Sequence, residues 1–270
     1  MARALHAPAL LLAFCACDMP PPPPEGGGGP IVIGMDPPDG AEGVDRLLEL
    51  RIGVDRPLSA LSVSRSSVRL LSGPERRLLS IRFDPARSEL IARDFHGHPL
   101  APGVLYRVEV EGIRDLDGVP MAAPFRASFT TGSEEGTLPA APDVGFGQVA
   151  PIFAERCASS SCHGGSRPAL GLDLSSPEAI RATALGVPAS QIAVAEDLAG
   201  AERPWGGISG LAIVDQTAGA GRPELSYLLY KVLGDPHIVG DPMPPLEEGG
   251  LSRAQILLLS DWIFAGASLR

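Results

Sequence analysis

The chain lacks the motifs that mark common enzyme classes. No G-x-S-x-G, H-E-x-x-H or P-loop pattern occurs in its 270 residues, so the sequence indicates no hydrolase, metalloprotease or nucleotide site. Beyond a short apolar run near the amino terminus, no stretch of about 18 apolar residues is present, and we expect no further membrane-spanning helix. The formal net charge of −10 is unfavourable for a bare nucleic-acid binder, so we expect no nucleic-acid partner.

Aromatic residues and cysteines are also scarce. Aromatics make up 5% of the chain, whereas it contains 32 glycines and 28 prolines, a balance that favours short strands, turns and linkers over a long helical bundle. The apolar fraction of 44% is sufficient for a core in one or two domains. The four cysteines stand at positions 15, 17, 157 and 162.

The amino terminus has the pattern of an export signal. Arg3 precedes a short apolar run at residues 9–14, which is too short to span a bilayer as a mature helix, so residues 1–16 are expected to be a signal peptide. Cys17 follows the small Ala16, and this arrangement resembles that of bacterial lipoproteins. The resemblance implies lipidation of Cys17 and an exported protein, anchored at the periplasmic face or cell surface of a Gram-negative bacterium. An ordinary secreted protein is the alternative.

Residues 17–30 contain a polyproline run followed by four glycines, Gly26 to Gly29. Polyproline is stiff and extended, whereas a glycine run is flexible. We therefore expect this segment to be a tether that holds a folded domain away from a surface.

Residues 31–132 show the alternation of half-buried strands. Apolar residues recur at every second position in residues 48–54 and 106–110, and turn signals such as Asp115-Leu-Asp-Gly118 separate such runs. About seven short strands over ~100 residues predict an antiparallel β-sandwich. The segments 37–44, 100–106 and 115–118 and the closing Phe-Thr-Thr-Gly at 129–132 resemble bacterial Ig-like domains of the SbsA type. The resemblance implies a spacer or adhesion module.

The remainder of the chain has helical periodicity. Residues 133–144 are expected to form a linker, and residues 145–270 a second, mainly α domain. Val149, Ile152 and Phe153 predict one face of a helix that ends near Cys157. Further helices are expected after the caps at 175–178 with a stop at Gly186, over 223–231 with a stop at 234, and from the capping box at 252–255 to about 265.

The helical half contains Cys157-Ala-Ser-Ser-Ser-Cys162-His163. Two nearby thiols followed by a histidine suit covalent haem attachment, because the thiols can add to the two vinyl groups and place the imidazole under the iron. The usual motif has two residues between the cysteines, and here there are four. Met243, in a proline-flanked loop, is the candidate second axial ligand, and His237 is the alternative.

The order of a first helix, C-x4-C-H, a Met-Pro-Pro loop and a final helix resembles class I cytochrome c domains, particularly the myxobacterial kind with widened cysteine spacing. The resemblance covers about residues 145–270. It implies one covalent haem c on Cys157 and Cys162, with His163 as the proximal and Met243 as the distal iron ligand. The expected function is one-electron transfer rather than enzymatic catalysis, with a basic or neutral redox protein as partner.

Three alternatives stay open. A Cys157–Cys162 disulfide would make the protein a haem-free binding or adhesion lipoprotein. A zinc ion held by Cys162, His163 and His237 would require two adjacent residues on one tetrahedral centre. A haem whose sixth position is open would make the protein a sensor or catalyst.

Overall fold

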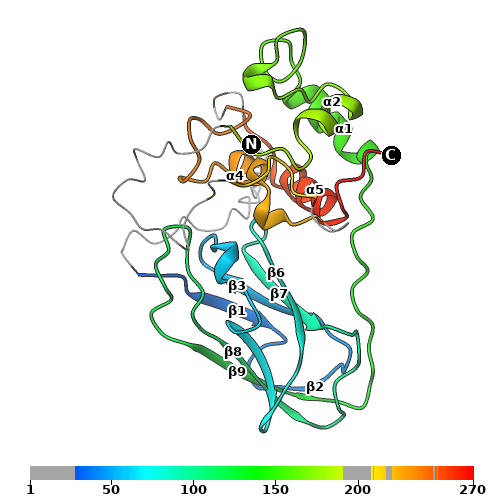
Figure 1. The fold of residues 1–270 in the computed structure, drawn as a ribbon. Helices are drawn as coiled ribbons and strands as arrows, with labels where there is room; N and C mark the ends of the chain where they lie inside the picture. Colours follow the sequence, from blue (N-terminus) through cyan, green and yellow to red (C-terminus); the bar gives the residue numbers. More distant parts are fainter. Residues whose placement is uncertain (1–27, 191–207, 209, 217–220, 246, 248) are drawn as a thin grey trace, which may run out of the picture.

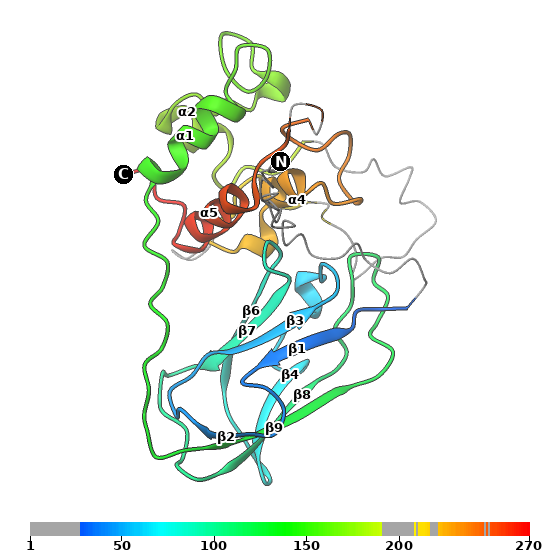
Figure 2. The same cartoon turned by 180° about the vertical axis from the view of Figure 1, so that it is seen from behind.

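The computed structural model describes residues 28–190, 208, 210–216, 221–245, 247 and 249–270 (Figure 1). The expected signal peptide, Cys17 and most of the tether lie outside the described residues. The named strands fall within residues 32–131 and the α-helices within residues 146–264. Figures 1 and 2 show the strands at one end of the molecule and the helices at the other, with the 133–144 segment running along the outside between them.

The described residues contain nine strands in two sheets. Their bounds are β1 Val32–Asp36, β2 Ala41–Val44, β3 Leu50–Val54, β4 Val68–Ser72, β5 Glu75–Arg76, β6 Leu79–Asp84, β7 Glu89–Asp94, β8 Leu105–Val110 and β9 Phe125–Thr131. One sheet has the order β1-β3-β7-β6 and the other the order β2-β9-β8-β4-β5. The two sheets enclose a common apolar core, which confirms the expected β-sandwich.

The alternating sequence pattern explains which side chains form this core. Leu50, Ile52 and Val54 of β3 are each at most 2% exposed, because successive side chains of a strand point to opposite faces. Two expectations were incomplete. The sequence patterns missed the short strands β1, β2 and β5, and the pairing of β2 with β9 is parallel where an antiparallel sandwich was expected.

The regular elements described between residues 145 and 270 are helices. The α-helices are α1 Phe146–Arg156, α2 Pro177–Thr183, α4 Tyr227–Leu233 and α5 Arg253–Phe264, and the 3-10 turns are η2 Ala169–Gly171 and η4 Pro223–Leu225. A further 3-10 turn, η1 Ala60–Ser62, belongs to the sandwich. None of the helices in the described part of the chain is long and apolar enough to cross a membrane.

Local signals account for most helix ends. The α5 capping box is formed: the Ser252 side chain accepts from the Gln255 N–H, and the Gln255 side chain accepts from the Ser252 N–H. Gly234 ends α4 in the left-handed conformation, as its position predicts. The expected stop of α2 at Gly186 was wrong, since the helix ends at Thr183, whose hydroxyl bonds back to the backbone at Asp173.

An aromatic cluster holds α1 against α5. The Trp262 ring is fully buried and meets the Phe153 ring edge-to-face with 5.6 Å between centroids. Its indole N–H donates to the Ser268 carbonyl over 2.9 Å, so the polar end of the buried ring is satisfied. The first and last helices of the helical half therefore share one core.

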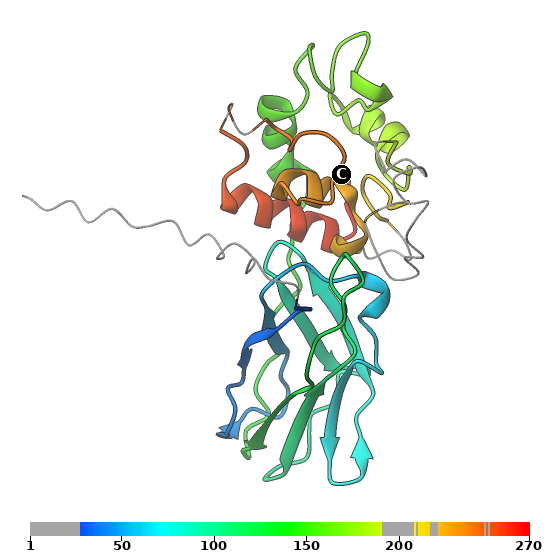
Figure 3. The ribbon, with the colours of Figure 1, turned by 90° about the vertical axis from the view of Figure 1, so that its left-hand side faces the viewer.

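The two halves are joined by polar contacts at the end of β6 and β7, where α5 crosses the sandwich (Figure 3). Arg87, in the turn between the two strands, pairs with Asp84 at 2.7 Å and with Asp261 of α5 at 2.9 Å. The Ser260 hydroxyl also donates to Asp84 over 3.1 Å. These contacts seat α5 on the sandwich.

Candidate functional site

The Cys157–His163 segment forms a compact loop at the end of α1. Cys157 is the C-cap residue of α1, and its N–H donates to the Phe153 carbonyl over 3.0 Å. The loop is closed where the His163 N–H donates to the Cys157 carbonyl, also over 3.0 Å. Backbone bonds therefore hold both ends of the cysteine segment together, although four residues separate the thiols.

Contacts after the loop fix its exit. The Cys162 carbonyl accepts from the Ala169 N–H and the His163 carbonyl from the Leu174 N–H, each over 2.8 Å. Gly164 is buried against the Ala158 carbonyl so closely that a Cβ atom there would collide with the backbone. A glycine is thus required directly after His163 for the chain to pass its own loop.

The cysteine and histidine side chains of the loop are partly buried. Cys157 and Cys162 are free thiols and half-buried, so the alternative disulfide is not formed in this structure. Burial raises the pKa of the Cys157 thiol to about 11, which keeps it protonated at neutral pH. The Nδ1 atom of His163 is buried and finds no hydrogen-bond partner among the described residues.

Met243 lies in a loop that α4 holds in place. Its N–H donates to the Lys231 carbonyl over 3.1 Å, and the Lys231 ammonium donates to the carbonyls of Val239 and Asp241 over 2.6 and 2.9 Å. Lys231 is 6% exposed, and burial lowers its pKa. No local sequence pattern predicts this role for Lys231, although its being the single lysine of the chain is a signal that the sequence does carry.

His237 is engaged elsewhere. Its Nδ1 lies 2.7 Å from Asp235, and its Nε2 lies 3.2 Å from Asp117 in a loop of the sandwich. The hydrogen bond with Asp235 is the main cause that raises the pKa of His237. Both ring nitrogens therefore face carboxylates, and His237 ties the helical half to the sandwich.

The structure brings Cys157, Cys162 and His163 into one loop, and Met243 into a separate one. No hydrogen bond or ion pair joins the two loops within the part of the chain that the structure describes. No group of three metal-binding His, Cys, Asp or Glu side chains occurs among those residues either. The alternative zinc set of Cys162, His163 and His237 is therefore not assembled among the described residues.

No protein-family model and no curated protein matches the chain. Solved structures resemble it at low identity. PcoC, a methionine-rich copper resistance protein from Escherichia coli, is 14% identical with a TM-score of 0.32, over 38% of this chain and 97% of PcoC. CopC from Methylosinus trichosporium OB3b is 13% identical with a TM-score of 0.32, over 41% of this chain and 99% of CopC.

Domains 1–6 of the surface layer protein SbsC are 13% identical with a TM-score of 0.30, over 42% of this chain. The chain spans 14% of the length of that SbsC structure. Similarity this weak supports no inference about what the chain binds or does.

Proposed function

We propose that the protein is an exported, lipid-anchored monohaem c-type cytochrome that transfers single electrons, with the β-sandwich as a spacer. The Cys157–His163 loop is the main support for this proposal. It brings two free thiols to the end of one helix, next to a histidine whose buried Nδ1 has no hydrogen-bond partner among the described residues. A buried polar atom without a partner is costly, so a bound group at this loop has a physical rationale.

The chain's own residues supply the attachment and the ligands. Each thiol would add its S–H across one vinyl group, forming a thioether, and His163 would ligate the iron. The bound haem would accept and release one electron, while its ligands and burial set the potential. The packing of α5 on α1 would keep the loop end of α1 in place during this exchange.

Met243, rather than His237, would supply the second iron ligand. Both ring nitrogens of His237 lie beside carboxylates, so ligation by His237 would break an ion-pair contact with the sandwich. The Met243 thioether has no such competing bond to a residue that the structure describes, and its backbone N–H donates to α4. A thioether ligand in addition to the His163 imidazole would raise the reduction potential.

The test is expression of the full chain in a host with cytochrome c maturation, followed by intact mass and oxidised and reduced visible spectra. We expect one covalent haem and a sharp reduced α-band, both lost in Cys157→Ser/Cys162→Ser. A colourless protein would overturn the proposal. A mass lower by two hydrogens would then identify the disulfide form and leave a haem-free lipoprotein.

The distal ligand is tested separately with Met243→Leu, and Met121→Leu in the sandwich serves as the matched control. Loss of the thioether should change the oxidised spectrum and lower the potential, whereas the control should leave both unchanged. Carbon monoxide binding by the untreated protein would instead indicate an open sixth position and a sensor or catalyst.

A further inference from the structure

Residues 239–243 double back along the last turn of α4. Gly234 ends the helix in the left-handed conformation, and a Cβ atom at Gly234 would lie 3.5 Å from the Pro242 ring. One residue after this proline, the Met243 N–H donates to the Lys231 carbonyl over 3.1 Å. The segment therefore follows the end of α4, and this helix is the element that can decide where Met243 lies.

Two side chains on one face of α4 reach this segment. Tyr227 and Lys231 are four residues apart, a spacing that places both on the same side of a helix. The Tyr227 hydroxyl accepts from the Val239 N–H over 3.1 Å. The Lys231 ammonium donates to the carbonyls of Val239 and Asp241 over 2.6 and 2.9 Å. Among the described residues, every hydrogen bond that residues 239–243 form goes to α4.

Lysine chemistry explains how one side chain can hold two points of an irregular segment. An ammonium group carries three N–H donors on a flexible stem, so it can bond two carbonyls that belong to different residues. Lys231 is 6% exposed, and its bonds to the two carbonyls are charge-assisted, which makes them stronger than bonds between neutral groups. The exposed Asp241 carboxylate also attracts this ammonium. Loss of the ammonium would leave both carbonyls without their donor.

We propose that Lys231, supported by Tyr227, is the positioning residue that holds Met243 where its thioether can ligate the haem iron. This inference rests on the proposed function and adds to it that α4 fixes the second iron ligand. The bonds of Lys231 and Tyr227 lie within the chain, so they can form before a haem is attached. A ligand that is already held binds without the cost of ordering its loop. Without these bonds, the sixth position would be open for part of the time.

The test is Lys231→Leu in the full chain from a host with cytochrome c maturation. Leucine keeps an apolar stem and the backbone carbonyl that Met243 uses, but it has no donor. We expect unchanged covalent haem by intact mass, because the cysteine loop is not altered. The oxidised spectrum should shift toward that of Met243→Leu, and the potential should fall. Carbon monoxide should bind the reduced protein about tenfold more tightly or better, since charge-assisted hydrogen bonds are lost.

Two further variants of α4 provide a control and a milder test. Tyr230→Phe removes the hydroxyl of a neighbouring residue, which donates to the Glu224 carbonyl over 3.0 Å, and should leave the spectrum, potential and carbon monoxide affinity unchanged. Tyr227→Phe keeps the ring and removes one bond to the segment, so all three should move in the direction of Lys231→Leu but less far. This variant tests the proposal even where Lys231→Leu does not fold.

A double variant shows whether Lys231 acts through Met243. In the Met243→Leu background, Lys231→Leu should change neither the oxidised spectrum nor the carbon monoxide affinity any further. A further change of the same size as in the wild type would overturn the proposal. So would a wild-type spectrum in both Lys231→Leu and Tyr227→Phe, or an equal shift in Tyr230→Phe.

Hydrogen exchange gives a readout that does not depend on the iron. Between Met243→Leu and the double variant Met243→Leu/Lys231→Leu, the Val239 amide should exchange about tenfold faster or more in the latter. Equal exchange would overturn the role of Lys231 in holding the segment. A colourless wild type would instead overturn the proposed function, and the exchange result would still decide whether Lys231 holds residues 239–243.

Discussion

Replacement of Arg87 tests how the sandwich and the helical half are joined. The Arg87 side chain is 25% exposed, and its Asp84 partner is 2% exposed whereas Asp261 is 23% exposed. Arg87→Met would therefore leave a buried carboxylate without its cation. Removing one partner of a buried pair costs about 3–5 kcal/mol, but two backbone N–H groups and Ser260 still bond to Asp84. We therefore expect Arg87→Met to lower the free energy of unfolding by about 2–3 kcal/mol.

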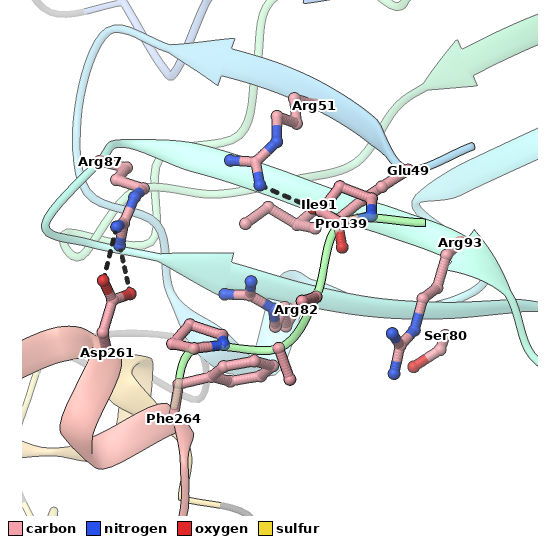
Figure 4. Close-up of a pocket in the computed structure, with 13 residues that line it drawn as sticks. Glu49, Arg51, Ser80, Arg82, Arg87, Ile91, Arg93, Pro139, Asp261 and Phe264 are labelled. Carbon is pink, nitrogen blue, oxygen red and sulfur yellow. Dashed lines mark hydrogen bonds and ion pairs between the residues drawn. The ribbon is translucent and has the colours of Figure 1, made fainter. Parts of the chain in front are cut away.

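Asp261→Asn removes the more exposed of the two carboxylates. Arg87 then keeps its pair with Asp84, and exposed pairs contribute about 0–1 kcal/mol, so we expect a loss of about 1 kcal/mol. The first loss is expected to be larger because of burial. Arg87 neutralises the buried Asp84, whereas water can take the place of the more exposed Asp261 carboxylate (Figure 4).

Urea titrations followed by tryptophan fluorescence measure these losses, because Trp262 lies in the core that α5 shares with α1. Arg107→Met, an exposed substitution on β8, is the control and should stay within about 0.5 kcal/mol of wild type. A loss for Arg87→Met no larger than that of this control, or a larger loss for Asp261→Asn than for Arg87→Met, would refute this role of the Arg87–Asp84 pair.

Three further substitutions test burial, packing and the loop. Burial raises the pKa of Glu224 in the η4 turn. The protonated carboxyl therefore stabilises the fold below the usual pKa of a glutamate, and this stabilisation is lost as the pH rises through the pKa of the folded protein. Glu224→Gln should raise the thermal midpoint more at pH 7 than at pH 4, and equal shifts at the two pH values would contradict this. Leu229→Ala in the helical core should lower the free energy of unfolding, measured by urea titration, by about 2–5 kcal/mol, whereas the exposed Leu61→Ala should lower it by less than about 0.5 kcal/mol. Similar losses in the two variants would contradict the burial of Leu229 in this core. Gly164→Ala should reduce covalent haem per chain by intact mass, whereas Gly147→Ala, which has open space around it, should not.

Sequence patterns of short range predicted much of the fold. Alternation located β3 and β8, and the periodicity of Val149 and Phe153 located α1, because each pattern reports one buried face of one element. The start of α5 followed from its capping box. Patterns of this kind failed for β1, β2 and β5, whose strands are short or largely exposed and so carry little apolar alternation.

The candidate site was predicted unevenly. The cysteine and histidine positions are visible in the sequence because they are adjacent, and the structure joins them in one loop. Lys231 holds the Met243 loop through backbone carbonyls, which carry no sequence signature. The contact of His237 with Asp117 has no sequence signature either, because Asp117 lies 120 residues earlier in the chain and the tertiary structure brings the two residues together.

The sequence by itself determined the longer strands, the main helices and the Cys157–His163 motif, since strand periodicity, helix caps and neighbouring cysteine and histidine residues are encoded within a few residues. Only the tertiary structure decided the pairing of Arg87 with Asp261, 174 residues apart, and the row of Arg51 and Arg82 across β7. These contacts depend on strand register and on how α5 meets the sandwich, which arise from the packing of distant segments. These arginine contacts are therefore properties of the assembled domains.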